Sequence, residues 1–200
     1  MRHFISILFF CALLAPGYSF SQNNTSKLRN GDLIFIVNPG GQGKAIQLAT
    51  HSKFTHIGVI FIENGRPVVY HAVEPVSKNT LEEFVRMSAD GSYEIKRLKD
   101  QSLLTDANVK AMLKQANQQL GIHYDIYFGW DDSRLYCSEF AWKLYKQNLH
   151  IDIGQLKTLK EFDLNNPIVK YKLQERYGHN IPLEEHMISP GDMYESVLLE

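Results

Sequence analysis

An Asn-Gly pair, Asn64 and Gly65, separates two segments that are rich in β-branched and aromatic residues, residues 55–62 and 67–73. Asn-Gly is the strongest short signal for a two-residue β-hairpin loop, because both residues tolerate the positive φ angles that such a turn requires. The sequence therefore predicts a hairpin with a defined register, and a sheet built around it.

This register places two histidines on one face of the hairpin. It pairs Glu63 with Arg66, and counting down the ladder puts His71 opposite Gly58, with His56 two residues further along. Opposed residues share a face and side chains alternate, so the imidazoles are diagonal neighbours whose backbones lie roughly 7–8 Å apart. Gly58 leaves room between them. One extra loop residue would reverse this assignment.

Cys137 lies where a helix is predicted to begin. Apolar residues recur with helical spacing after it, at positions 140, 144, 145 and 149. A thiol at a helix amino terminus feels the positive end of the dipole and the free backbone amides, so we expect its pKa to lie below the ordinary value of about 8.5. The same amides can hold an oxyanion.

A removable export signal is predicted for residues 1–21. A short basic start precedes an apolar run at residues 4–14, which is too short to span a bilayer comfortably, and small residues favour cleavage near Ser21. Cys11 lies in that run, so Cys137 would be the only cysteine left. We expect a periplasmic or extracellular location, where an unpaired cysteine is kept either buried and inert or for its chemistry.

The remaining chain, residues 22–200, has the length of one domain. A hydrophobic content of 44% indicates an ordinary packed core. The net charge of −1 and the absence of Lys/Arg runs argue against nucleic acid or an anionic membrane as the main partner. No later segment is apolar enough to be an integral membrane span, and the sequence leaves the oligomeric state open.

The fold class predicted is α+β. A central, mainly antiparallel sheet carries the two histidines and packs against the helix that begins at Cys137. The other predicted elements are strands at residues 32–37 and 93–98 and helices at residues 44–50, 81–87 and 105–120.

A helix-terminal thiol beside a strand-borne histidine is the arrangement of papain-like enzymes. Here the histidines precede the cysteine in the chain. With this order the sequence resembles the YiiX-like branch of the NlpC-type papain-like superfamily, whose fold is circularly permuted. The matching residues cover most of the chain and are Gly121 with residues 31–35, 44–51, 56–58, 124–125 and 136–139, and, most specifically, the tail at residues 160–164, 175–178 and 180–185.

The resemblance implies a cysteine hydrolase, an amidase or peptidase without a cofactor. It makes Cys137 the nucleophile and His56 the general base, and it places Tyr124 near the thiol, where its hydroxyl could help to hold the oxyanion. Relatives of this branch carry a glutamate as third catalytic member. This chain has His71 there, and Glu74 three residues later falls on the other face of the hairpin, so the register favours His71.

Other functions fit the same residues. Cell-wall peptides, other peptides, N-acyl amides and lipids are all possible substrates of such a thiol. A lipid acyltransferase or phospholipase of the lecithin retinol acyltransferase type would use the same thioester, and a binding module would keep only the cleft. Zinc bound by His51, His56, His71 and Cys137 is less favoured, because close ligand pairs are lacking.

Overall fold

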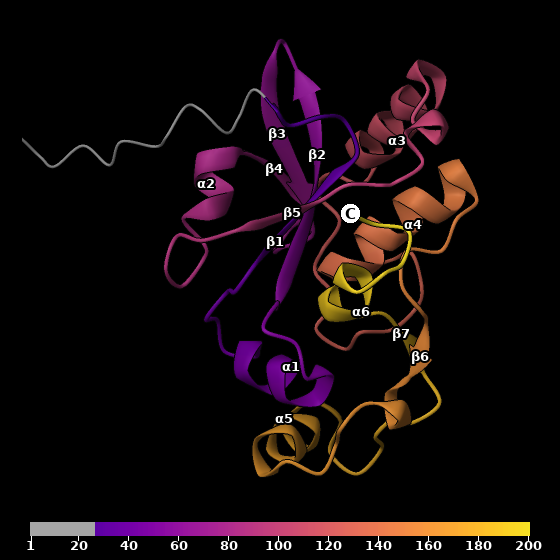
Figure 1. Cartoon of the computed structure of the whole chain (residues 1–200). Coiled ribbons are helices and arrows are strands. Elements are labelled where there is room, and N and C mark those ends of the chain that lie inside the picture. Colours follow the sequence, from indigo (N-terminus) through magenta and orange to yellow (C-terminus); the bar gives the residue numbers. More distant parts are fainter. Residues whose placement is uncertain (1–26) are drawn as a thin grey trace, which may run out of the picture.

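A computed structural model describes residues 27–200 of the chain (Figure 1). Its centre is a five-stranded sheet in the order β4-β3-β2-β1-β5, in which every neighbouring pair is antiparallel. The strands are β1 (Asp32–Ile36), β2 (His56–Glu63), β3 (Arg66–His71), β4 (Ser77–Thr80) and β5 (Glu94–Lys96). The predicted antiparallel sheet is confirmed, although β5 is shorter than the predicted strand and β4 was not predicted.

The hairpin has the predicted register. Glu63 pairs with Arg66, and the ladder continues in step to Val59 opposite Tyr70. The two loop residues between the strands have φ angles of 52° and 75°, the left-handed values that Asn and Gly adopt at least cost.

Helices cover both faces and one end of the sheet. They are α1 (Gly43–Thr50), α2 (Leu81–Val85), α3 (Asp106–Gln118), α4 (Cys137–Leu149), α5 (Pro167–Tyr177) and α6 (Pro190–Tyr194). Single turns of 3-10 helix, η2 (Gln101–Leu103) and η3 (Leu159–Glu161), and a two-stranded ribbon of β6 (Lys157–Thr158) and β7 (His186–Met187) complete the structure. The predicted helices are confirmed, and α4 begins at Cys137 as expected.

The two faces of the sheet have separate apolar cores. Helix α2 lies on one side and α3 with α4 on the other (Figure 1). On the α2 side, Ile60 and Val69 pack with Phe84 of that helix. On the α4 side, Val59 packs in a larger cluster with Phe140. Strand alternation decides these faces, since neighbouring residues of a strand point in opposite directions.

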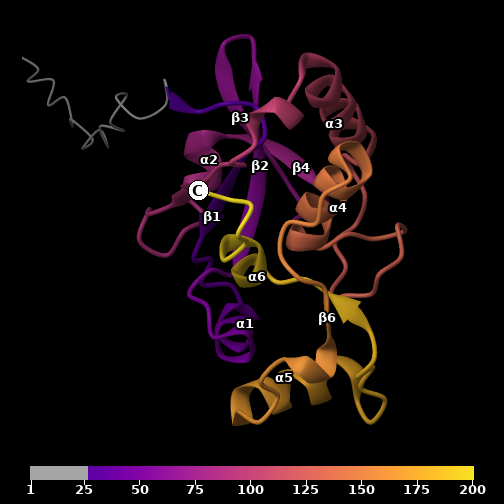
Figure 2. The ribbon, with the colours of Figure 1, turned by 45° about the vertical axis from the view of Figure 1, so that its right-hand side comes forward.

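The carboxyl-terminal segment folds back onto the end of the sheet where α1 lies. Helix α5 lies beside α1 in both views (Figures 1 and 2), and the backbone N–H of Asp163 donates to the carbonyl of Ala49 at 2.9 Å. Within residues 27–200, none of the helices is long and apolar enough to cross a membrane. The predicted export signal lies outside these described residues.

Candidate active site

Cys137 is the first residue of α4, and its side chain is almost fully enclosed, with 4% of the residue exposed. Burial raises the pKa of its thiol to about 11, while backbone amides of Ile57 and Ser138 lower it by less. The expectation of a lowered pKa was therefore wrong for the free protein. The cost of placing a thiolate away from water exceeds what the helix terminus supplies.

His56 and His71 meet as the hairpin register predicts. Nε2 of His56 lies 2.8 Å from Nδ1 of His71, and Nε2 of His71 lies 2.8 Å from Oδ1 of Asn79 on β4. Position 58 between them on the strand requires glycine, because a Cβ there would stand 2.4 Å from a methyl group of Val69. The histidines thus form a chain of hydrogen bonds that ends at Asn79.

The hydrogen bonds of this chain favour one arrangement of its protons. The amide nitrogen of Asn79 faces Oε2 of Glu83 at 3.5 Å, which leaves Oδ1 as the acceptor for His71. A neutral imidazole has one N–H and one bare nitrogen. If Nε2 of His71 carries the hydrogen, Nδ1 of His71 accepts from Nε2 of His56. Nδ1 of His56 is then the bare nitrogen, free to take a proton.

Both histidines are held in the neutral form. Burial lowers the pKa of His56 well below its ordinary value, with a further lowering by His71, and burial also lowers the pKa of His71. The ring of Phe84 stacks on His56 and stands edge-on to His71, with ring centres 5.5 and 5.0 Å away. This apolar wall disfavours a charged imidazolium.

The histidines and the thiol approach the end of the sheet from opposite faces. His56 shares a face with Ile60, on the side of α2, whereas α4 packs on the other side. Within residues 27–200, no hydrogen bond joins the thiol to the His56 ring. Cys137 lines one cavity and His56 lines the next, and both cavities are also lined by Tyr124 and Thr55.

Tyr124 lies beside the thiol, as the resemblance implied. The residue is half-buried, and the removal of its hydroxyl from water, together with the neighbouring Cys137, raises the pKa of the phenol well above the ordinary value. The hydroxyl therefore keeps its proton and can donate it in a hydrogen bond. It also receives a hydrogen bond from Nε2 of Gln42 at 3.2 Å.

Glu74, the alternative third member, makes no hydrogen bond to either histidine of the pair within residues 27–200. Its carboxylate accepts from Nδ1 of His123 at 2.5 Å and from the backbone N–H of Tyr124 at 2.9 Å. Glu74 thus anchors the segment that carries Tyr124, and of the two candidates it is His71 that hydrogen-bonds to His56.

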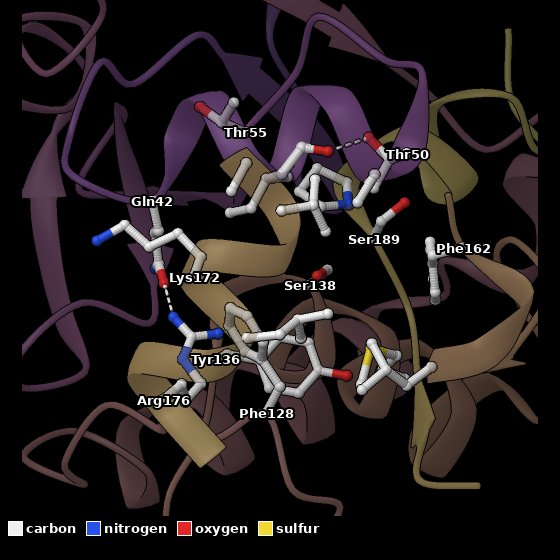
Figure 3. A pocket seen from close by; sticks show the side chains of 18 of the residues that line it. Gln42, Thr50, Thr55, Phe128, Tyr136, Ser138, Phe162, Lys172, Arg176 and Ser189 are labelled. Carbon is white, nitrogen blue, oxygen red and sulfur yellow. Dashed lines mark hydrogen bonds between the residues drawn. The ribbon is translucent and has the colours of Figure 1, made fainter. Parts of the chain in front are cut away.

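The cavity next to Cys137 has an apolar interior and a polar edge (Figure 3). Side chains of α1, α5 and the segments before α4, α5 and α6 form its wall, among them Ile46, Phe128, Leu164, Leu173 and Ile188. Gln42, Lys172 and Arg176 lie together on one side, where Nη2 of Arg176 donates to Oε1 of Gln42 at 2.7 Å (Figure 3). The carboxyl-terminal tail therefore closes one side of this cavity.

Three residues of this site were not predicted. Asn79 lies on a short strand whose polar sequence carries no strand pattern, and Gln42 lies in a glycine-rich loop. Arg176 lies in the tail that resembles the YiiX-like proteins. This resemblance was the only feature of the sequence that pointed to it.

The four candidate zinc ligands are not gathered into one site in the described part of the chain. His51 pairs with Asp163, its Nε2 3.3 Å from the carboxylate, and 74% of its side chain is exposed. Across the described part of the chain, no group of three or more His, Cys, Asp or Glu side chains is placed to hold a metal ion.

An antiparallel sheet with a cysteine at the start of the packed helix, and histidines earlier in the chain, defines a permuted papain-like protein. The family model for permuted papain-like amidase enzymes, YaeF/YiiX, matches residues 27–199. The chain belongs to this family.

Two comparisons identify similar proteins. YiiX of Escherichia coli (strain K12), described as uncharacterized, is 40% identical over 168 residues, which span 84% of this chain and 82% of YiiX. A crystal structure described as metalloprotein yiiX from Escherichia coli O157:H7 matches with a TM-score of 0.82 and 41% identity, and covers 86% of this chain and 94% of that chain. The permuted papain-like fold predicted from the sequence is confirmed.

Proposed function

We propose that this chain is a cysteine amidase that cleaves amide bonds through a thioester on Cys137, with His56 as general base. The observation that carries the proposal is the chain of hydrogen bonds from Asn79 through His71 to His56. From it we infer that Nδ1 of His56 carries no proton. Membership of the permuted papain-like amidase family supports hydrolysis as the kind of reaction.

The reaction begins from a neutral thiol and a neutral imidazole, because burial favours the uncharged form of both. As Sγ of Cys137 attacks the carbonyl carbon, its proton passes to Nδ1 of His56. The backbone N–H of Cys137 and the hydroxyl of Tyr124 stabilise the oxyanion. The hydrogen bonds that these steps need are often long in a free enzyme and shorten when the substrate binds.

The second half of the reaction returns the site to its starting state. The tetrahedral intermediate collapses, the C–N bond breaks, and His56 gives its proton to the leaving amine. Water then attacks the thioester while His56 takes one of its protons. When the C–S bond breaks, the carboxylic acid leaves and the proton returns to the sulfur of Cys137.

The apolar wall of the cavity favours N-acyl amides with an apolar acyl group as substrates. Leu164, Leu173 and Phe128 offer a hydrocarbon chain an environment that excludes water. Cell-wall peptides are polar and fit this apolar wall less well. They are the second substrate class that we propose for an amidase.

A lipid acyltransferase or phospholipase activity is the alternative that the same cavity favours. It would form the same thioester on Cys137 and pass the acyl group to an acceptor other than water. Products analysed with and without an added alcohol or amine acceptor distinguish the two reactions. A non-catalytic binding module would form no thioester.

The word metalloprotein in the description of the similar crystal structure concerns that protein. In this chain, the described residues do not fit a metal site, because His56 and His71 hydrogen-bond to each other and the second nitrogen of His71 faces Asn79. We therefore propose a reaction without a metal step. Dialysis against a chelator should leave activity unchanged, and a loss of activity that zinc restores would contradict this.

We also propose that the protein is exported and that its mature form begins at Gln22. The apolar run at residues 4–14 and the small residues after it support this proposal. Amino-terminal sequencing of protein recovered from the periplasm and the medium tests it, and recovery of the intact chain from the cytoplasm alone would contradict it.

The amidase proposal is tested by trapping the acyl-enzyme. The mature protein is mixed with a long-chain acyl p-nitroanilide, and intact mass spectrometry is recorded at short times. We expect release of p-nitroaniline and a mass increase equal to the acyl group on Cys137, and neither with Cys137→Ala. Full activity of Cys137→Ala would contradict the proposal, as would the absence of both adduct and product with acyl and peptide anilides.

A further inference from the structure

A row of hydrogen-bonding side chains connects the carboxyl-terminal helix α5 to the thiol. Arg176 on α5 donates to Oε1 of Gln42 at 2.7 Å, and Nε2 of Gln42 donates to the hydroxyl of Tyr124 at 3.2 Å. Tyr124 in turn lies beside Cys137. Arg176 and Gln42 are 134 positions apart in the sequence, so only the folded tail brings them together.

Arg176 decides which way the Gln42 amide points. A guanidinium group has donors and no acceptor, so it can bind only the oxygen of the amide. The NH₂ group of Gln42 must then face Tyr124. Arg176 is itself held in place, because its guanidinium lies 4.4 Å from the centre of the Phe128 ring.

The orientation of the amide decides in turn what Tyr124 can do. Its oxygen already accepts a hydrogen from Gln42, and its own O–H must therefore donate elsewhere. The neighbouring acceptor is the sulfur of Cys137, or the oxyanion that forms there. The positive charge of Arg176 and the hydrogen bond from Gln42 both favour negative charge near Tyr124.

We propose that Gln42 and Arg176 are positioning residues that force the hydroxyl of Tyr124 to donate toward Cys137. Neither side chain needs to contact the reacting atoms. The tail that carries Arg176 thereby becomes part of the catalytic apparatus as well as one wall of the cavity. This inference rests on the proposed amidase reaction.

A double-mutant cycle on Gln42 and Tyr124 tests the proposal. Gln42→Met removes the donor while keeping the side-chain length, and should lower kcat/KM for a long-chain acyl p-nitroanilide about tenfold, the effect of one lost hydrogen bond to a charged transition state. In a Tyr124→Phe background there is no hydroxyl to orient, and we expect less than a twofold further loss. Equal losses in both backgrounds would indicate a merely structural role and overturn the proposal.

Arg176 is tested in the same way. Arg176→Met should reduce kcat/KM severalfold, and Arg176→Lys should reduce it less. In the Gln42→Met background, neither substitution at position 176 should change kcat/KM further. Lys170→Met, an exposed position on the same helix, is the matched control and should have no effect. A loss with Arg176→Met that persists in the Gln42→Met background would overturn the coupling.

A measurement that needs no substrate separates this inference from the amidase proposal. The rate of alkylation of Cys137 by iodoacetamide is followed from pH 7 to pH 10 in each variant. Gln42→Met and Tyr124→Phe should each move the profile to higher pH, and the double variant should move it no further than Tyr124→Phe alone. Additive shifts, or none, would overturn the inference even if amidase activity is found, and coupled shifts would support it even if it is not.

Discussion

At the scale of single residues, the thiol and the two imidazoles of the site are uncharged at rest. Burial holds the thiol of Cys137 protonated and the imidazoles of His56 and His71 neutral. A preformed thiolate–imidazolium pair would require two charges in a place that excludes water. We instead expect charges to form only during the reaction. The attack on the substrate then creates an oxyanion, which accepts a hydrogen bond from Tyr124.

The first prediction follows from the raised pKa of Cys137, about 11. The alkylation rate of the unmodified protein should still be rising above pH 8.5, the pKa of a free cysteine. The rate at each pH is measured by quenching the iodoacetamide reaction at set times and quantifying alkylated Cys137 by mass spectrometry. A plateau reached below pH 7.5 would show that the thiolate is already formed in the free protein.

The second prediction concerns the histidine pair. His56→Ala should lower kcat/KM by about 10²- to 10⁴-fold, because it removes the proton acceptor. His71→Ala should lower it less, because orientation is a smaller contribution than proton transfer. Steady-state kinetics on the acyl anilide compare the two. A neutral His71→Ala together with an inactive Glu74→Ala would show that Glu74 is the third member instead.

At the scale of an element, α4 contains two buried charged side chains behind the cysteine. Glu139 is fully buried, and its carboxylate accepts from the backbone N–H of Tyr136 at 3.2 Å and from Nζ of Lys143 at 2.7 Å. Burial raises the pKa of Glu139 to about 7, and Lys143 opposes that shift. The pair fixes the first turn of α4, which aims the backbone N–H of Cys137.

The third prediction is that Lys143→Met destabilises the protein by about 3–5 kcal/mol, because it leaves the buried Glu139 carboxylate without its cationic partner. Adding Glu139→Gln should recover much of this loss, since no charge then remains. Lys146→Met is the control and should cost less than about 1 kcal/mol, because its pair with Asp152 is exposed. Urea unfolding measures all four proteins, and equal losses for Lys143→Met and Lys146→Met would refute the argument.

At the scale of the whole molecule, the sheet brings a neutral histidine pair into the interior between β2, β3 and α2. Both pKa values lie below the unfolded value of about 6.5. Above pH 6.5 neither state binds a proton there, and the pair does not affect stability. As the pH falls below 6.5, the unfolded chain takes up protons that the native protein cannot, so stability falls.

The fourth prediction is a loss of stability of up to roughly 1.4 kcal/mol per histidine for each pH unit below 6.5, until the native pKa values are reached. Thermal or urea unfolding between pH 7 and pH 5 measures it. The double variant His56→Gln/His71→Gln should show a smaller slope. His179→Gln, at an exposed position, should keep the slope of the unmodified protein. An unchanged slope in the double variant would contradict the prediction.

Much of the fold and part of the site follow from the sequence alone, because their causes are local. The Asn-Gly loop sets the register of the hairpin, and the register sets which side chains share a face. His56 and His71 are therefore together before any long-range packing is known. The start of α4 at Cys137 follows in the same way from the helical spacing of the apolar residues after it.

The tertiary structure alone decided the electrostatics of the site and the partners that complete it. The pKa of Cys137 depends on burial by segments distant in the chain, which outweighs the helix terminus visible in the sequence. Asn79 reaches His71 because β4 pairs with β3, and Arg176 reaches Gln42 because α5 folds back onto α1. Desolvation and long-range hydrogen bonds arise from the packing of distant segments, so they cannot be predicted from the spacing of residues along the chain.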